Sequence, residues 1–64
     1  MTSKNKNFKP NDIKQLRKAR RMTQAEFGRF VGVSVSAVKK WELALQIPSP
    51  PVMKLMELAE KGTI

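Results

Sequence analysis

Residues 23–42 read TQAEFGRFVGVSVSAVKKWE and contain two short helix patterns on either side of a glycine. Thr23 is followed three residues later by Glu26, the spacing at which a hydroxyl and a carboxylate cap the start of a helix reciprocally. Gly32 can end this helix in a left-handed backbone conformation. Ser34 can then cap the next helix. The stretch therefore predicts two helices joined by a short turn, over residues 24–31 and about 35–44.

Each of these two helices has a narrow apolar face. Phe27 and Val31 lie four residues apart in the first helix, and Val38 and Trp41 lie three apart in the second. This spacing places each pair on one side of its helix, so all four residues are predicted to be buried. Gly28 stands beside Phe27, where a glycine disfavours a helix by roughly 1 kcal/mol relative to alanine. We therefore expect another helix to approach Gly28 closely.

The flanking sequence adds a helix on each side. Pro10 fits the first position of a helix over about residues 10–20, with Ile13 and Leu16 facing inward. Ser49 is predicted to cap a last helix, which continues to about Gly62 and buries an apolar stripe made of Val52, Leu55, Met56 and Ala59. No strand pattern is present, so the fold class is all-α, a compact domain of four helices with a fifth left open. The domain is expected over residues 10–64, and residues 1–9 are interpreted as a flexible basic arm.

The composition of the 64 residues excludes several kinds of chemistry. Lys and Arg number 13 against 5 Asp and Glu, which gives a net charge of +8. Residues 1–40 hold 11 of the basic and 2 of the acidic side chains, so one half of the chain suits a polyanion. Cys and His are absent, which removes disulfides, thiolate chemistry, a structural zinc site and the commonest general base. We predict neither an enzyme nor a cofactor.

The sequence also argues against a membrane location. No apolar run approaches the ~18 residues that a membrane span needs. Residues 1–7 are polar and basic and do not resemble a secretory signal. A cationic peptide lying on a membrane is disfavoured, because Gly32 and the pair Pro50-Pro51 would interrupt one long interfacial helix. These features lead us to expect a cytoplasmic protein.

The stretch 23–42 resembles the phage-repressor and Cro-like, or XRE-type, helix-turn-helix family. The resemblance rests on Thr-Gln-x-Glu, Gly-Val-Ser and Val-x-x-Trp-Glu at fixed spacing, and extends from about Ile13 to Leu58. It implies a lambda-repressor-like DNA-binding domain whose second motif helix enters the major groove of double-stranded DNA. The positions that face bases in this family are here Ser34, Val35, Ser36, Lys39 and Lys40.

The resemblance implies further roles. The positions that approach DNA phosphates in this family are Lys14, Arg17, Thr23 and Gln24, and Gln24 also braces the groove-binding helix. Arg17 matches the position that pairs with Glu42, which leads us to favour a structural ion pair over direct DNA binding by Arg17. No metal ligand is implied. The side chains themselves agree, since lysine can donate to guanine, serine to several bases, and valine can contact the thymine methyl.

The chain departs from the family pattern at two turns. Arg21 stands where a glycine is often found before the second helix. After the groove-binding helix, the stretch LALQI replaces the usual polar residue, glycine and basic residues, so a phosphate clamp is not expected there. The apolar residues could cover the core or form a subunit interface, for which the candidates are Phe30, Leu43, Leu45 and Ile47.

We therefore predict a sequence-specific DNA-binding transcriptional regulator, expected to be a repressor and to act as a homodimer on DNA. The alternative is an antitoxin of the host-inhibition type, which resembles this domain, neutralises a partner toxin and regulates its own promoter. In that case the segment 43–47 or the arm would bind the toxin. A reading frame for a small basic toxin beside the gene would favour this alternative.

Overall fold

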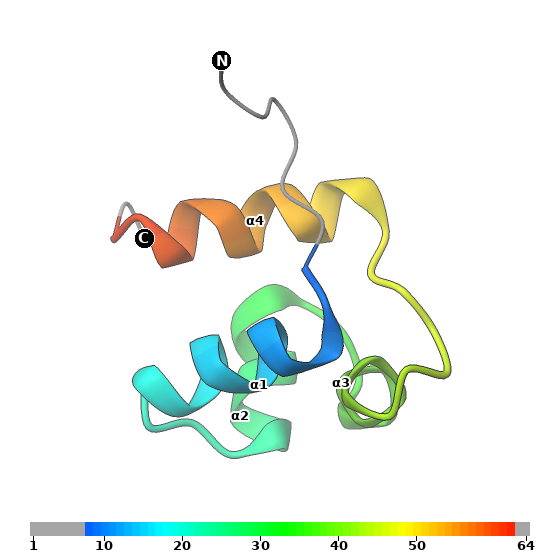
Figure 1. Cartoon of the computed structure of the whole chain (residues 1–64). Helices are drawn as coiled ribbons and strands as arrows, with labels where there is room; N and C mark the ends of the chain where they lie inside the picture. The colour runs from blue at the N-terminus through cyan, green and yellow to red at the C-terminus, as the bar shows by residue number, and fades with distance from the viewer. Residues whose placement is uncertain (1–7, 63–64) are drawn as a thin grey trace.

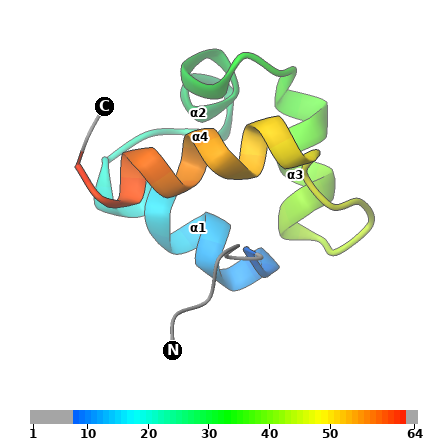
Figure 2. The same ribbon diagram turned by 90° about the horizontal axis from the view of Figure 1, so that it is seen from above.

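The computed structural model describes residues 8–62, and this part of the chain forms four α-helices and no strand. They are α1 (Pro10–Ala19), α2 (Gln24–Val31), α3 (Val35–Glu42) and α4 (Pro50–Glu60). Figure 1 shows α4 along one side of the other three helices, and Figure 2 shows it crossing over them. The predicted all-α fold and the order of the helices are confirmed. No helix within these residues is long and apolar enough to cross a membrane.

The start of α2 carries the capping box expected from the sequence. The backbone N–H of Glu26 donates to Thr23 Oγ1 at 3.1 Å, and the backbone N–H of Thr23 donates to Glu26 Oε1 at 2.8 Å. At the other end, Gly32 adopts the left-handed conformation, with φ of 84°. Two donors that would otherwise lack partners at the helix start are thereby satisfied, which fixes where α2 begins.

Gly28 allows a close approach, but not by another helix as the sequence led us to expect. A Cβ at this position would lie 2.8 Å from the backbone oxygen of Val33, in the turn that leads into α3. The same turn folds back on α2, because the N–H groups of Gly32 and Val33 both donate to the Gly28 carbonyl at 2.8 Å. Gly28 therefore sets the distance between α2 and the start of α3.

The core draws on all four helices and on one residue that precedes them. Phe8 is only 2% exposed, although the sequence placed it in a flexible arm. Its apolar ring packs in the core, so residues 8 and 9 lead directly into the domain, while residues 1–7 of the expected arm lie outside the described residues. The buried apolar residues include every core residue expected in α1, α2 and α3: Phe8, Ile13, Leu16, Phe27, Val31, Val38, Trp41, Met56 and Ala59.

Helix α3 is shorter than predicted. It ends at Glu42 rather than near Ala44, because Ala44 adopts a left-handed conformation with φ of 62°. Arg21, in the turn before α2, has φ of 57°. Left-handed backbone disfavours a residue with a Cβ by roughly 1–2 kcal/mol. Both strained residues are therefore at the two turns where the sequence departs from the glycine-containing family pattern.

Helix α4 begins without the side-chain cap that Ser49 was predicted to supply. Ser49 occupies the cap position, but its hydroxyl accepts no cap hydrogen bond. Pro50 and Pro51 fill the first turn and have no N–H to offer, which leaves fewer donors for a cap. Of the predicted apolar stripe, Met56 and Ala59 are buried, and the other two residues, Val52 and Leu55, are half-buried.

Candidate nucleic-acid interface

The outer face of α3 carries the residues that the sequence assigned to base contacts. Val35, Ser36, Lys39 and Lys40 are all exposed, whereas Val38 and Trp41 on the inner face are buried. Val35 and Lys39, like Ser36 and Lys40, are four residues apart and so lie one turn above each other. The helix therefore presents to solvent a strip made of one valine, one serine and two lysines, which runs along most of its length.

Ser34 and the first turn of α3 form the start of the helix and differ from the exposed strip in their hydrogen bonding. Ser34 Oγ accepts from the backbone N–H of Ala37 at 3.2 Å, which caps the helix. The first turn of α3 holds no acidic residue, in contrast to α1 with Asp12 and α2 with Glu26. The positive end of the α3 dipole is thus left unneutralised by a neighbouring carboxylate, which suits a phosphate-rich partner.

A bidentate ion pair anchors the C-terminal end of α3 to α1. Arg17 Nε donates to Glu42 Oε2 at 2.7 Å, and Arg17 Nη2 donates to Glu42 Oε1 at 3.0 Å. The two side chains are 12% and 4% exposed, so water competes little with the pair. Breaking a buried pair by removing one partner typically destabilises a protein by about 3–5 kcal/mol. The ion pair expected from the family pattern is thus present with two-point geometry.

Two further hydrogen bonds extend the pair into a network that joins three helices. Gln24 Nε2, at the start of α2, donates to Glu42 Oε1 at 3.1 Å. Arg17 Nη1 donates to the carbonyl oxygen of Met22 at 3.0 Å. The sequence offered no signal for the second contact, because any residue supplies a backbone carbonyl. The network fixes the orientation of α3 against α1 and α2.

The network also sets the ionisation of its two charged members. Burial alone would raise the pKa of Glu42, but hydrogen bonds from Arg17 and Gln24 and the charges of Arg17 and Lys14 together lower it below its ordinary value. The hydrogen bond to Glu42 raises the pKa of Arg17. The charge of Lys14, which is exposed on α1, contributes to this lowering of the Glu42 pKa.

Three of the residues expected to contact phosphates make hydrogen bonds within the domain: Arg17, Thr23 and Gln24. Arg17 is turned inward, with its guanidinium bonded to Glu42 and Met22, and these bonds hold α3 against α1. The N–H of Thr23 is already donated to Glu26 in the capping box. Its hydroxyl oxygen accepts within the same box, which leaves the hydroxyl proton as the donor of Thr23 toward a ligand. Half-buried Gln24 donates to Glu42, and Lys14 is exposed on α1.

The four residues expected at a subunit interface do not share one environment. Phe30 is half-buried and its ring centroid lies 6.1 Å from that of Phe27. The guanidinium of Arg20 lies over the Phe30 ring at 4.9 Å and also donates to the carbonyl oxygen of Ala59 at 3.0 Å. Phe30 is therefore part of the packing between α2 and the ends of α1 and α4. The other three candidates, in the segment after α3, are largely exposed.

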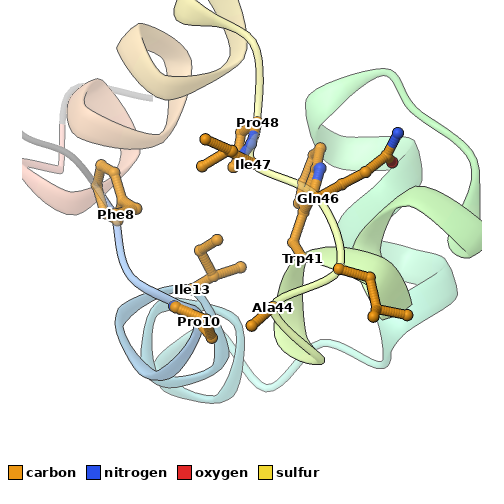
Figure 3. A pocket seen from close by; sticks show the side chains of 9 residues that line it. Phe8, Pro10, Ile13, Trp41, Ala44, Gln46, Ile47 and Pro48 are labelled. Atoms are coloured by element: carbon orange, nitrogen blue, oxygen red, sulfur yellow. The ribbon is translucent and has the colours of Figure 1, made fainter.

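An open apolar pocket of about 200 Å³ lies between α1, α3 and the segment that follows α3. Figure 3 shows Ile13, Trp41 and Ile47 around this hollow, with Phe8 on its far side and Gln46 turned outward. Its lining residues carry no ionisable side chain. Within residues 8–62, no three Asp, Glu, His or Cys side chains gather as metal ligands would.

The sequence of the chain is similar to that of a known family and of known proteins. Residues 13–60 match the sequence profile of the helix-turn-helix family. An uncharacterized HTH-type transcriptional regulator of Escherichia coli strain K12, YiaG, is 43% identical over 49 residues, which cover 77% of this chain and 51% of that protein. The YiaG proteins of Escherichia coli O6:H1 and O157:H7 match to the same extent. The chain thus spans about half the length of the curated relatives it matches.

Proposed function

The chain belongs to the XRE-type helix-turn-helix family of DNA-binding transcriptional regulators, and on this premise we propose that it binds a specific DNA sequence by placing α3 in the major groove. The observation that carries the proposal is the exposed strip Val35, Ser36, Lys39 and Lys40 on a helix held rigidly from behind. A major groove about 12 Å wide accepts one α-helix.

The side chains of the strip define what this helix can read. Lys39 and Lys40 can donate to the O6 and N7 atoms of guanine, Ser36 to several bases, and Val35 can contact the methyl group of thymine. The strip carries no Asn or Gln, the residues that recognise adenine by two hydrogen bonds. We therefore propose that part of the specificity comes from the shape and deformability of the DNA.

The charge of the chain supplies the affinity that does not depend on sequence. With a net charge of +8, most of it in residues 1–40, the protein attracts the phosphate backbone before any base is read. The logarithm of the binding constant should fall with the logarithm of salt concentration, with a slope of about −0.9 for each phosphate neutralised. We assign this attraction to phosphates to three exposed lysines, Lys39 and Lys40 on α3 and Lys14 on α1.

We further propose that the regulator acts as a repressor and binds as a homodimer. Two copies would occupy half-sites about one helical turn of DNA apart. In this proposal the bound protein represses by excluding other proteins from the same promoter DNA. The homodimer doubles the number of contacts, which an isolated helix of eight residues needs for specific binding.

The antitoxin alternative is favoured by one observation, the exposed apolar segment after α3. Leu43, Leu45 and Ile47 are between 67% and 77% exposed, and such a surface suits a protein partner. A toxin bound there would leave the outer face of α3 able to bind DNA. This second candidate function predicts that a small toxin protein copurifies with the chain, whereas the first requires DNA alone.

Selection of bound DNA from a random pool tests the proposed function. We expect the enriched sequences to contain two related half-sites about 10 base pairs apart, centre to centre. Ser36→Ala should change the preferred bases within each half-site, while Lys54→Ala on the exposed side of α4 should not. Recovery of no enriched sequence with protein that is folded by circular dichroism would contradict the proposal.

A further inference from the structure

The open apolar pocket of about 200 Å³ lies on the inner side of α3, away from the exposed strip. Trp41 near the end of α3, Ile13 on α1 and Ile47 in the segment after α3 stand around it (Figure 3). Trp41 and Ile13 are 4% and 1% exposed, so these two walls belong to the core. The proposed contacts with DNA, on the outer face of α3, make no use of this pocket.

The remaining wall of the pocket, the segment after α3, is held in place by its backbone. The N–H of Ala44 donates to the carbonyl oxygen of Trp41 at 3.2 Å, and the N–H of Leu45 donates to that of Lys40 at 2.8 Å. Pro48 is buried at the far end of the segment. The pocket is therefore formed before any ligand arrives, which reduces the loss of freedom on binding.

The size and lining of the pocket limit what it can hold. Pockets for drug-sized ligands measure roughly 300–1,000 Å³, whereas an apolar cavity of about 150 Å³ takes up benzene. A pocket of about 200 Å³ therefore suits a molecule with a single ring. The lining residues carry no ionisable side chain, so a charged molecule would lose its hydration there without gaining a partner. The fitting ligand is thus small and uncharged.

Trp41 brings one polar group to the pocket, its indole N–H. Within residues 8–62 this side chain donates no hydrogen bond, and no buried side-chain nitrogen or oxygen there lacks a partner. The N–H is therefore accessible from outside, although the residue as a whole is only 4% exposed. An oxygen atom of a ligand can accept from this donor.

We propose that the pocket binds a small uncharged molecule with one ring and one oxygen acceptor, which accepts a hydrogen bond from the indole N–H of Trp41. The molecule contacts α1 through Ile13 and the end of α3 through Trp41 and Ala44, so it connects these two helices from within. The site goes beyond the proposed function and does not depend on DNA binding.

The fluorescence of Trp41 tests the proposal, because this is the only tryptophan of the chain and it lines the pocket. Cyclohexanol is the probe, since it has one ring, one hydroxyl oxygen and no charge, and cyclohexanecarboxylate is the matched charged compound. We expect cyclohexanol to change the fluorescence with saturation at a Kd of about 1 mM, a usual strength for so small a ligand. Cyclohexanecarboxylate should bind at least tenfold more weakly. Equal binding of the two compounds, or no saturable change with cyclohexanol, overturns the proposal.

Two exposed residues of the same segment supply matched variants. Ile47 is 77% exposed and lines the pocket, whereas Leu43 is 67% exposed and is not among the lining residues. Ile47→Ser should weaken the binding of cyclohexanol several-fold, and Leu43→Ser should leave it unchanged. Both variants should keep the circular dichroism spectrum of the natural chain, because both side chains are exposed. Equal effects of the two substitutions contradict binding in this pocket.

The indole N–H resonance of Trp41 in nitrogen-15-labelled protein tests the hydrogen bond. Cyclohexanol should move this resonance downfield in step with the fluorescence change. A resonance that stays in place while the fluorescence saturates removes the hydrogen bond and with it the proposal.

The same titration at a low and a high protein concentration identifies the occupant. We expect one Kd for cyclohexanol at both concentrations. A weaker apparent affinity at the high concentration would show that an apolar side chain of a second copy fills the pocket, and this also overturns the proposal. None of these outcomes bears on the selection of DNA from a random pool, which tests the proposed function alone.

Discussion

The two ends of α3 are built in contrasting ways. At its start, Gly28 lets the turn approach α2, Gly32 takes the left-handed position at φ of 84°, and Ser34 caps the helix. At its end, Ala44 takes a left-handed position at φ of 62°, and the neighbouring side chains of Leu43, Leu45 and Ile47 are exposed to water. At the start of α3, the residue types are those that the local backbone conformation requires. The second end combines a strained backbone residue with exposed apolar surface, so local geometry alone does not explain its sequence.

The largest change in stability is expected when the ion pair at the end of α3 is broken. Glu42→Ala removes one partner and leaves the guanidinium of Arg17 largely buried, so we expect a loss of about 3 kcal/mol in the free energy of unfolding. Thermal or urea unfolding followed by circular dichroism measures it. Glu57→Ala is the matched control, since the lysine partners of Glu57 lie at 3.9 and 3.7 Å and are 70% and 63% exposed. Such surface pairs contribute about 0–1 kcal/mol. Equal losses in the two variants would remove Glu42 from its anchoring role.

Acid should weaken the same anchor by a smaller amount. The pKa of Glu42 is lowered in the folded state, so its contribution is fully present above the ordinary glutamate value of 4.5 and is lost as the pH falls through the lowered value. A protonated carboxyl can still accept the hydrogen bond from Gln24, which limits the loss. The natural chain should thus lose stability below pH 4.5 more steeply than Glu42→Gln does. Parallel pH profiles for the two proteins would show that Glu42 has no lowered pKa.

At the start of α3, a single methyl group should disturb the turn. Gly28→Ala places a Cβ 2.8 Å from the Val33 oxygen, and overpacking of this kind typically costs about 1–3 kcal/mol. The better helix propensity of alanine returns roughly 1 kcal/mol. We expect a net loss of about 1 kcal/mol and a lower melting temperature. An unchanged or higher melting temperature would show that the turn can move away from α2 freely.

The left-handed residues on either side of α3, Gly32 and Ala44, should change the stability of the domain in opposite directions when they are substituted. Ala44→Gly relieves backbone strain and should stabilise the domain by up to about 1 kcal/mol, whereas Gly32→Ala should destabilise it by a similar amount. Space does not complicate the second exchange, because nothing lies within 4 Å of a Cβ at Gly32. Unfolding midpoints of both variants in urea measure the effects. Destabilisation by Ala44→Gly would show that the left-handed conformation of Ala44 carries no backbone strain.

Local signals in the sequence were sufficient for the helices and for most of the core. The Thr23–Glu26 box, Gly32 and Ser34 act within three residues of their own helix ends, so their spacing alone locates both ends of α2 and the start of α3. Phe27, Val31, Val38 and Trp41 follow the helical period and are buried as predicted. The order of four helices is a consequence of these local rules.

Features that depend on distant parts of the chain could not be predicted in the same way. Phe8 has a polar and basic neighbourhood in the sequence, and only the closed fold provides the core in which it is buried. The contact from Arg17 to the Met22 carbonyl has no sequence signal at all. For the candidate site, the family pattern supplied the residues of the strip on α3. The structure then separated Arg17, which faces inward, from the lysines that face solvent.

The DNA affinity of Lys39→Ala tests the central claim, that the outer face of α3 binds DNA, most directly. Fluorescence anisotropy with a labelled sequence from the random pool gives the dissociation constant, and Lys54→Ala serves as the control for loss of one exposed charge. We predict that Lys39→Ala weakens binding about tenfold, within the roughly 1–3 kcal/mol of one specific base contact, and leaves the melting temperature nearly unchanged. Equal affinities of Lys39→Ala, Lys54→Ala and the natural chain would contradict the claim.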